Sequence, residues 1–456
     1  MAEKTNDFTQ GGIPKTIIRV ALPMIGAQII NVLYSIVDKM YISRLPGIGT
    51  IAMTGVGVTF PLIMIISAFS MLAGMGGAPL CSIARGEKRV GYAERVMGNA
   101  FSLLLLFAVV LTVISLSVKT PVLYMIGASA ETFPYANEYL SIYLCGNLFS
   151  MIALGMNPFI NAQGFTRMGM LTVALGAVTN IILDPLFMFT FGMGVRGAAL
   201  ATILSQALSA CWVLKFLTGK KTLLKLTPNN MRPDKKIISN ILRLGTSTFT
   251  MNLTECLSVL VCNRTLMDFG GNEYVAVMTV ISSVRQILML PISGFGQGLQ
   301  PVMGYNYGAK RYDRVRQSFL FSVIVSTCYA TIACLITQFL PEFLIRPFNP
   351  DGSLIPLAIA PLKLYFSFFF VLSLQMSGQY SFVALGKSRQ AVFFSLLRKA
   401  FIVAPFAYIL PRVTNMGPMG VFAAEPISDI VGSLACFITF LVTVWPNLEK
   451  KQEVAS

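Results

Sequence analysis

Apolar stretches long enough to cross a lipid bilayer recur along the whole chain, and this repetition limits the possible folds more than any other feature. A helix needs about twenty apolar residues to cross a hydrocarbon core of about 30 Å. Only 12% of the 456 residues are charged, whereas soluble proteins carry about 25%. We therefore expect an all-α polytopic membrane protein. About twelve spans are predicted, at 16–43, 53–82, 96–118, 137–162, 168–191, 196–217, 238–263, 274–303, 316–340, 358–384, 391–411 and 419–445.

The net charge of +16 is better explained by membrane topology than by a nucleic-acid partner. If both termini lie on one side of the membrane and basic residues toward span ends are counted with the adjoining segment, most of the 35 Lys and Arg residues fall on that side. Only Lys39 and Arg285 are then assigned to the interior of a span. Positive residues accumulate in cytoplasmic loops. We therefore predict that both termini are cytoplasmic and that the protein binds no nucleic acid.

The chain divides into two similar halves. Its longest polar connector is KKTLLKLTPNNMRPDKK, and the halves align at an offset of about 222 residues, for example MLAGMGGAPLCSIARGEKR with SGFGQGLQPVMGYNYGAKR. Since each half holds six spans, both enter the membrane from the same side, as in parallel transporter repeats. The predicted segments are an N-terminal stretch at 1–15, a lobe at 16–219, a linker at 220–237, a second lobe at 238–445 and a tail at 446–456.

The sequence lacks the residues that metal binding, ATP hydrolysis and enzymatic catalysis require. Histidine is absent and the eight cysteines form no CxxC pair, which argues against a zinc or haem site. Without a Walker A sequence, ATP hydrolysis in this chain is not expected to drive transport. No nucleophile lies beside a plausible base, so we expect no enzyme and no cofactor. The polar start does not resemble a cleavable signal peptide.

One acid lies within an apolar run, in the sequence TNIILDPLFMF. Asn180 precedes Asp184 by one helical turn, so both lie on one helix face. Pro185 has no N–H group, which frees a backbone carbonyl and bends the helix. Thr202 adds a hydroxyl if its span packs alongside. These oxygen atoms predict a site for a hard cation or a proton.

A second acid, Asp38, lies toward the outer end of the first span. Ionisable residues within spans are expensive and usually functional, which favours a place for Asp38 in the same cation site. The alternative is an acid at a helix end that pairs with Lys39 or Arg44. The sequence leaves both interpretations open.

The second half carries its own ionisable residues. Glu255 lies near the middle of its span, and Arg285 is one available partner. We interpret Glu255 as a coupling residue or a contact for a substrate cation, with a static ion pair as the alternative. Glu425 and Asp429 lie four residues apart on one helix face. They are expected to line an aqueous vestibule or to pair with Arg412.

Together these residues resemble the multidrug and toxic compound extrusion (MATE) family, and in particular its MepA-type bacterial members. The resemblance covers nearly the whole chain and rests on Pro23, VDKMYISR, ARGEKR, NYGAKR, NAQGFTRMG, NIILDPLF and GVRGAALAT. It implies two six-helix lobes forming a V in the plasma membrane of a bacterium, and cation-coupled export of organic cations. We expect helix hinges at Pro23 and Pro185.

The resemblance also implies roles for individual residues. Some branches of the family use an acid that falls on Glu255, but their partner acid has no counterpart here, where the segment offers only Gln375 and Gln379. This departure favours ion coupling in the first lobe and leaves Glu255, Arg285 and Gln375 to attract substrate. Apart from Na⁺ at Asp38 and Asp184, no metal is expected. The positions that match the family's coupling-cation site are Asp38, Asn180, Asp184 and Thr202.

The expected mechanism is antiport. With Asp38 and Asp184 ionised, the first lobe would hold a drug cation among its Met and Phe side chains. Entry of Na⁺ or H⁺ would neutralise the acids, shift the first helix and release the drug outward. The expected partners are cationic drugs or dyes and the lipid bilayer, and the protein is expected to be a monomer.

Two alternatives differ in class. A flippase for lipid-linked saccharides shares the two-lobe plan, but it would favour a cationic cavity for pyrophosphate, whereas acids predominate among the charges placed within the spans. An integral membrane enzyme is disfavoured because the sequence offers no metal-ligand cluster and no activated nucleophile.

Overall fold

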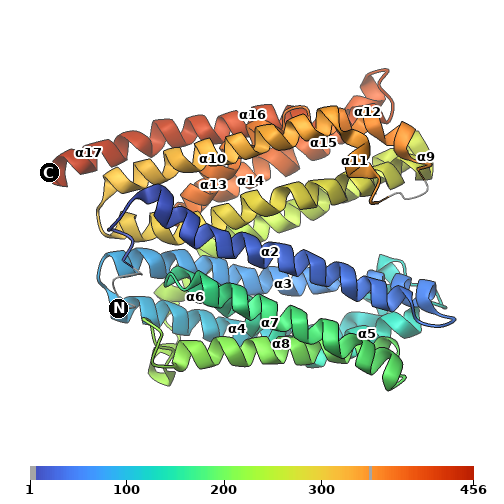
Figure 1. Ribbon diagram of the computed structural model, residues 1–456, viewed down its shortest axis with the longest axis horizontal. Helices are drawn as coiled ribbons and strands as arrows, with labels where there is room; N and C mark the ends of the chain where they lie inside the picture. Colours follow the sequence, from blue (N-terminus) through green and yellow to red (C-terminus); the bar gives the residue numbers. More distant parts are fainter. Residues whose placement is uncertain (1–6, 349–351, 456) are drawn as a thin grey trace. The chain divides into compact units, whose positions relative to one another are not determined.

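The computed structural model describes residues 7–348 and 352–455, and that part of the chain is helical with no strand (Figure 1). Three short segments depart from α geometry: the π-helices η1 (Leu186–Thr190) and η3 (Leu397–Val403), and the 3₁₀-helix η2 (Pro228–Met231). The α-helices are α2 (Ile13–Ser43), α3 (Gly49–Gly86), α4 (Val90–Ile126), α5 (Phe133–Cys145), α6 (Asn147–Ala162), α7 (Thr166–Pro185), α8 (Val195–Thr218), α9 (Lys235–Gly308), α10 (Tyr312–Phe339), α11 (Pro341–Ile345), α12 (Ile355–Tyr365), α13 (Phe369–Ala384), α14 (Ser388–Leu396), α15 (Ala404–Val413), α16 (Met419–Thr443) and α17 (Trp445–Ala455).

The helices of the described chain are long and apolar enough to account for the predicted spans. Nine continuous helices qualify, and two bent pairs, α5 with α6 at 60° and α12 with α13 at 50°, raise the number to eleven. The 74-residue α9 consists of two helices that meet at Gly271, where φ is 66°. Counting these two separately gives twelve crossings. The prediction of an all-α polytopic membrane protein is therefore confirmed.

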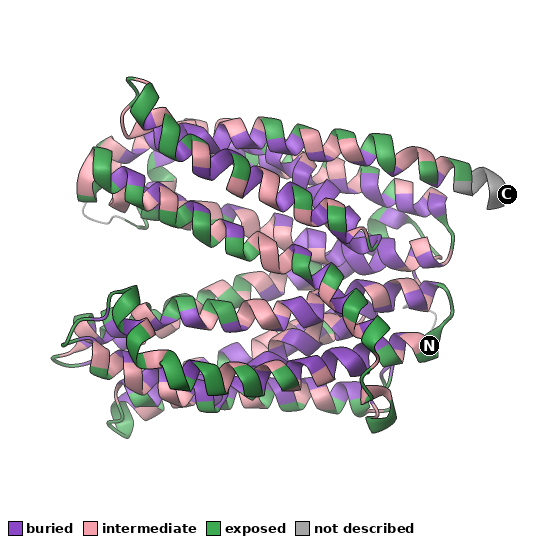
Figure 2. Ribbon diagram, turned by 180° about the vertical axis from the view of Figure 1, so that it is seen from behind, coloured by how far each residue is buried: buried purple, intermediate pink, exposed green. Residues whose placement is uncertain are grey.

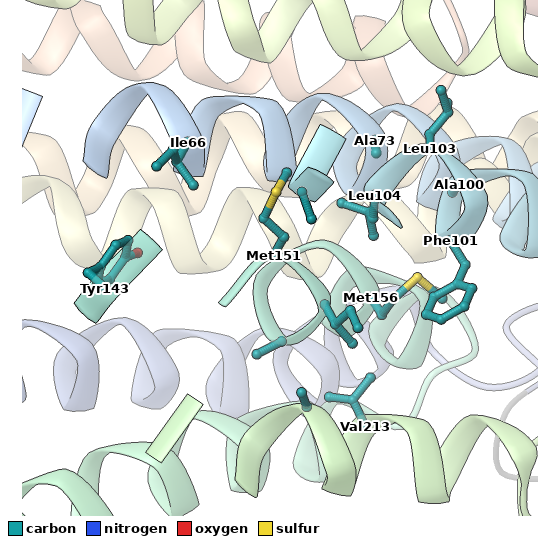
Figure 3. Packing of buried hydrophobic residues seen from close by; sticks show 14 of the residues in the cluster. Ile66, Ala73, Ala100, Phe101, Leu103, Leu104, Tyr143, Met151, Met156 and Val213 are labelled. Atoms are coloured by element: carbon teal, nitrogen blue, oxygen red, sulfur yellow. The ribbon is translucent and has the colours of Figure 1, made fainter. Parts of the chain in front are cut away.

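Contacts between residues divide the chain into two compact units. The first unit contains Leu22–Gly245, and the second contains Asp7–Ala21 together with the chain from Thr246 onward. Both boundaries fall inside helices, one in α2 and one in α9. Each unit has its own hydrophobic core. In the first unit, Figure 3 shows Met151, Met156 and Leu104 packed among α3, α4, α6 and α8.

The helices keep one face for their own bundle and expose the other. Figure 2 shows buried and exposed residues alternating along the ribbons at helical spacing. On α4, the exposed face carries Leu106, Val109 and Val113, which are 56%, 62% and 59% exposed. A soluble protein rarely exposes a continuous apolar stripe of this kind. These faces are therefore expected to contact lipid.

The backbone repeats at the offset that the sequence predicted. Lys88 and Lys310 both have positive φ, 60° and 58°, and Gly164 and Gly386 have φ values of 87° and 72°. Each pair is separated by 222 positions. A non-glycine residue rarely adopts positive φ, so two lysines in the same loop conformation indicate that the two halves share a structural plan.

The connector between the halves is fixed to the first unit. The Oε1 atom of Gln163 accepts hydrogen bonds from Thr222 Oγ1, Leu223 N and Leu224 N, each at 2.8 Å. Glu94 Oε1 accepts a fourth from Lys225 N at 2.9 Å. Because these side chains satisfy backbone N–H groups of the connector, this part of it does not behave as a free linker.

Candidate functional site

A group of buried polar side chains lies between α7 and α8, which run side by side in the first unit (Figure 1). Asn180, Asp184 and Thr202 are 0%, 0% and 4% exposed. Asn180 Nδ2 donates to Asp184 Oδ1 at 3.2 Å and to Thr202 Oγ1 at 3.4 Å. The helical turn between Asn180 and Asp184 puts both on one face, as the sequence indicated. The structure thus brings these three predicted residues together.

Helix α2 adds Asp38 to this group. The Asp38 side chain lies close to that of Asp184, so two carboxyl groups meet in the site. No ion pair joins Asp38 to Lys39 or Arg44 within the chain that the structure describes, and the Lys39 ammonium instead lies 5.3 Å from the centre of the Phe60 ring. The pairing that the sequence left open is therefore not observed.

Two tyrosines complete the first-unit site. The side chains of Tyr34 of α2 and Tyr139 of α5 both lie close to that of Thr202. Tyr34 lies one helical turn before Asp38 and therefore shares its helix face. Tyr139 was missed, since nothing in the sequence indicates that α5 approaches α2 and α8 at this point.

Three oxygen atoms in this site lack a hydrogen-bond donor. Asp38 Oδ1, Asn180 Oδ1 and Asp184 Oδ2 are buried without a partner in residues 7–348 and 352–455. Buried polar atoms are normally hydrogen-bonded, so three unsatisfied acceptors in one place fit a cation better than a purely structural role. No three His, Cys, Asp or Glu side chains gather to hold a metal in the described residues, and this donor set suits a proton or a monovalent cation.

The helix does not simply bend at Pro185. It continues from α7 into the π-helix η1, where Phe191 N donates to Leu186 O, five residues earlier, at 3.0 Å. A π turn is typical of functional sites in helices. Gly197 of α8 lies directly against it, because a Cβ atom there would be 2.7 Å from the Phe187 carbonyl carbon. The small residue lets α8 approach the widened turn.

A second cluster of charges is buried in the second unit, around Glu425. This carboxylate accepts hydrogen bonds from Arg285, Arg398 and Lys399, the last at 3.2 Å. Arg285, which the sequence offers as one available partner of Glu255, contacts Glu425 instead, and Lys399 Nζ lies 3.0 Å from Glu255 Oε2. Glu425 is the centre of the cluster because it contacts all three cations, Arg285 from α9 and Arg398 and Lys399 from η3.

The other acid of α16 also differs from its expected contacts. Asp429 Oδ1 accepts from Arg398 at 2.8 Å, and both side chains are buried. Arg412, one of the two alternatives that the sequence left open for Glu425 and Asp429, lies 3.4 Å from Asp268. The pairing with Arg412 is therefore not observed, and the two acids belong to an internal ion-pair network.

Two cations of this network were missed in the sequence. Arg398 and Lys399 fall in the first half of the predicted span 391–411, and the topology argument counts them with the preceding loop, yet both are buried in the π-helix η3. Ser428 Oγ donates to Arg398 O and Ser258 Oγ donates to Lys399 O, each at 3.0 Å. These two bonds tie the backbone of η3 to α16 and α9.

The additional cations change the charge balance of the second unit. Acids do not predominate in its buried network, which contains three cations and three acids. The sequence-based argument that the charges within spans are mainly acidic is wrong for this unit. The members of the network are Arg285, Arg398, Lys399, Glu255, Glu425 and Asp429.

A cavity of about 420 Å³ opens beside the network within the second unit. Glu255, Lys399 and Arg285 contribute charges to its wall, and Tyr365 accepts a hydrogen bond from Arg285 at 2.6 Å. The Glu255 side chain is 45% exposed, far more than the other members of the network. The wall also contains four methionines, Met251, Met278, Met289 and Met376.

Gln375, predicted to contact substrate, lies outside this lining. It is 2% exposed, donates to Gln379 Oε1 at 3.5 Å and accepts from Ser433 Oγ at 3.4 Å. Gln379 in turn donates to Ser395 Oγ at 2.5 Å. These contacts place Gln375 in a polar layer between helices, and its neighbour Met376 lines the cavity.

Two bundles of apolar helices, one with an oxygen-rich site and one with a charged cavity, define a polytopic membrane protein with the buried ionisable sites typical of transporters. The MatE family profile matches residues 23–186 and 248–409. The chain therefore belongs to the MatE family.

Named relatives match over almost the whole length. The chain is 25% identical to the "Multidrug export protein MepA" of Staphylococcus haemolyticus, covering 95% of this chain and 94% of that protein. It is 23% identical to the protein of that name from Staphylococcus saprophyticus, with 94% of each chain covered.

Solved structures share the fold. "Crystal structure of MATE in the bent conformation" has a TM-score of 0.93 at 24% identity and covers 99% of both chains. The structure described as "Reverse polarity of binding pocket suggests different function of a MOP superfamily transporter from Pyrococcus furiosus Vc1 (DSM3638)" has a TM-score of 0.90 at 24% identity, covering 98% of this chain and 99% of the other.

Proposed function

We propose that this protein is a secondary active exporter of organic cations, driven by entry of Na⁺ or H⁺. The observation that carries the proposal is the set of three buried oxygens without donors at Asp38, Asn180 and Asp184. The names of the staphylococcal relatives support multidrug export as the activity. Neither a nucleotide site nor a metal cofactor enters the mechanism.

The first-unit site is proposed to bind the coupling ion. A cation placed among the unsatisfied oxygens would neutralise Asp38 and Asp184, whose side chains already lie close together. Asp38 lies on α2. The division between the two units falls within this helix, between Ala21 and Leu22 and next to Pro23. Neutralisation at one part of α2 can therefore act on a helix that both units share, with Pro23 as the proposed hinge.

The second-unit cavity is proposed to bind the cargo. Glu255 supplies an accessible carboxylate for a cationic group, and the methionines supply soft, polarisable contacts that tolerate different shapes. The expectation that a drug cation is held in the first lobe stays a prediction. A role for Arg285 in attracting substrate is indirect in this proposal, because it holds Tyr365 and Glu425 in the cavity wall.

The proposed location is the plasma membrane of a bacterium, with both termini in the cytoplasm, because Lys and Arg residues accumulate in the segments on the terminal side. A monomer suffices for this mechanism, since the ion site and the cargo cavity each lie within one unit of one chain.

Export of lipid-linked saccharides is not favoured, because both staphylococcal relatives described above are named multidrug export proteins. The cations found in the second unit mean that charge alone does not separate the two activities. Ethidium accumulation in cells and translocation of a lipid-linked precursor in vesicles separate them directly, and the proposal requires the first activity.

The proposal is tested in everted membrane vesicles that contain the protein, with ethidium fluorescence as the readout. A Na⁺ gradient and a pH gradient are imposed separately, and one of them must drive ethidium uptake. Vesicles without the protein are the control. Uptake that follows neither gradient would contradict ion-coupled transport.

Asp184→Asn is predicted to abolish driven ethidium uptake while the protein remains inserted. The variant keeps the shape of the side chain but removes the negative charge that attracts the coupling ion. Glu131→Gln is the matched control, since it removes an exposed acid from the same unit. Wild-type uptake by Asp184→Asn would contradict the proposed coupling site.

A further inference from the structure

Lys399 holds a special position in the second-unit network. Its Nζ atom lies 3.0 Å from Glu255 Oε2 and 3.2 Å from Glu425 Oε1, so a single ammonium bridges two acids. Among the residues that the structure describes, it is the one cation that forms an ion pair with Glu255. Glu425, by contrast, retains Arg285 and Arg398 if Lys399 leaves.

The two arginines are fixed in ways that Lys399 is not. Arg398 is held by both Glu425 and Asp429, and Arg285 by Glu425 and the Tyr365 hydroxyl. The planar guanidinium of arginine binds carboxylates in a fixed geometry, and a shift of the side chain breaks those hydrogen bonds. A lysine ammonium is a point charge on a flexible stem. Lys399 can thus shift toward Glu425 without breaking the rest of the network.

The backbone of Lys399 is tied to the helix that carries Glu255. Ser258 Oγ donates to Lys399 O at 3.0 Å, and Ser258 lies three positions after Glu255 on α9. The π-helix η3 thereby keeps the ammonium within reach of Glu255. Both side chains line the cavity, and Lys399 is 93% buried whereas Glu255 is accessible.

We propose that Lys399 is a tethered cation that occupies Glu255 when the cavity is empty and competes with cationic cargo for it. This inference rests on the proposed function. A cargo cation binds Glu255 by displacing the ammonium onto Glu425, which it already contacts. No bond is made or broken, and every group keeps its proton. Lys399 thereby sets a threshold: a weakly interacting cation does not displace it, whereas a cation that also fills the methionine-lined cavity does.

The test measures ethidium binding to the purified full-length protein in detergent. Lys399→Met is expected to lower the Kd about tenfold, the lower end of the coupling between close charged pairs. Lys399→Gln, whose amide still donates to Glu425, is a second variant with the same expected direction. Lys399→Arg keeps the charge and is expected to leave the Kd within about threefold of wild type. Lys363→Met, on a helix of the same unit but outside the cavity lining, is the matched control.

The gain in ethidium affinity that Lys399→Met is expected to give must depend on Glu255. Glu255→Gln is expected to weaken ethidium binding, and Lys399→Met combined with Glu255→Gln is expected to bind no better than Glu255→Gln alone. A loosened cavity would instead improve binding in the double variant as well, and that result would overturn the inference. An unchanged or raised Kd in both neutral variants would overturn it too. Absence of ethidium export by the wild-type protein would count against the proposed function instead, so the two failures are distinguishable.

Discussion

At the scale of single residues, buried charges in this protein are tolerated because their partners come from other helices. Glu425 is 4% exposed, and an isolated carboxylate at that depth would be very costly. It is compensated by Arg285 from α9 and by Arg398 and Lys399 from η3. The charge network therefore also holds α9, η3 and α16 together within the second unit.

Glu425→Gln is predicted to destabilise the second unit strongly. The substitution leaves Arg285 and Arg398 buried with one carboxylate fewer, and breaking a buried ion pair in this way costs about 3–5 kcal/mol. Thermal unfolding of the purified Glu425→Gln protein should show a clear loss of stability relative to the wild type. Glu273→Gln, which changes an exposed acid of the same unit, should unfold like the wild type. Equal stability of both variants would mean that the cluster contributes no net stabilisation.

The residues that the sequence revealed are those with a local signature. Asp184 stands out because it is an acid next to a proline in an apolar run, and Asn180 follows from helical periodicity. Arg398 and Lys399 have no such signature, because basic pairs near span ends usually mark the membrane boundary. Their burial depends on Glu255 and on acids of α16, whose positions relative to η3 are set by tertiary packing.

At the scale of helices, each unit places a π-helix beside a proline. In the first unit η1 follows Pro185, and in the second unit η3 ends just before Pro405. A proline removes one backbone donor and so loosens the helix. The sequence predicted the loosening at Pro185 but not its π form, because the form depends on which neighbouring groups satisfy the freed carbonyls.

Gly197→Ala is predicted to destabilise the first unit and to weaken ion-driven uptake. Its Cβ would meet the backbone of η1 at Phe187, and overpacking of this kind costs about 1–3 kcal/mol. Gly57→Ala is the matched control, because a Cβ there meets nothing within 4 Å. Thermal unfolding and ethidium uptake should separate the variants. Normal uptake with Gly197→Ala would mean that the approach of α8 to η1 does not position the ion site.

Gln163→Leu is predicted to release the connector from the first unit. Two backbone N–H groups, those of Leu223 and Leu224, lose their acceptor, at about 1–3 kcal/mol for each group left unsatisfied in the interior. Limited proteolysis should then cut the connector faster. Gln206→Leu, a half-buried glutamine on α8, is the control. Equal cleavage rates in the two variants would contradict the structural role assigned to Gln163.

At the scale of the whole molecule, one structural plan occurs twice with different charges. The shared loop conformations at Lys88 and Lys310 follow from the sequence repeat, so this part of the fold was predictable. The functional difference was not. In the first unit the oxygen-rich site lies beside its π-helix, whereas in the second unit the π-helix itself carries two cations that neutralise neighbouring acids. The sequence repeat does not indicate this difference in charge between the two units, because it aligns glycines and loop residues rather than buried charges.

This difference predicts that ion binding and cargo binding can be separated by mutation. Asp184→Asn should bind ethidium with a Kd within about threefold of wild type, because the second-unit cavity is unchanged, yet it should fail to couple uptake to either gradient. Glu255→Gln should lose affinity for ethidium while ²²Na⁺ binding, or the proton release that accompanies ion binding at Asp38 and Asp184, stays at the wild-type level. Both variants are compared in purified protein and in vesicles. If Asp184→Asn instead abolishes ethidium binding and Glu255→Gln leaves it intact, the cargo is bound in the first unit, and the division of roles between the two units is the reverse of the one proposed.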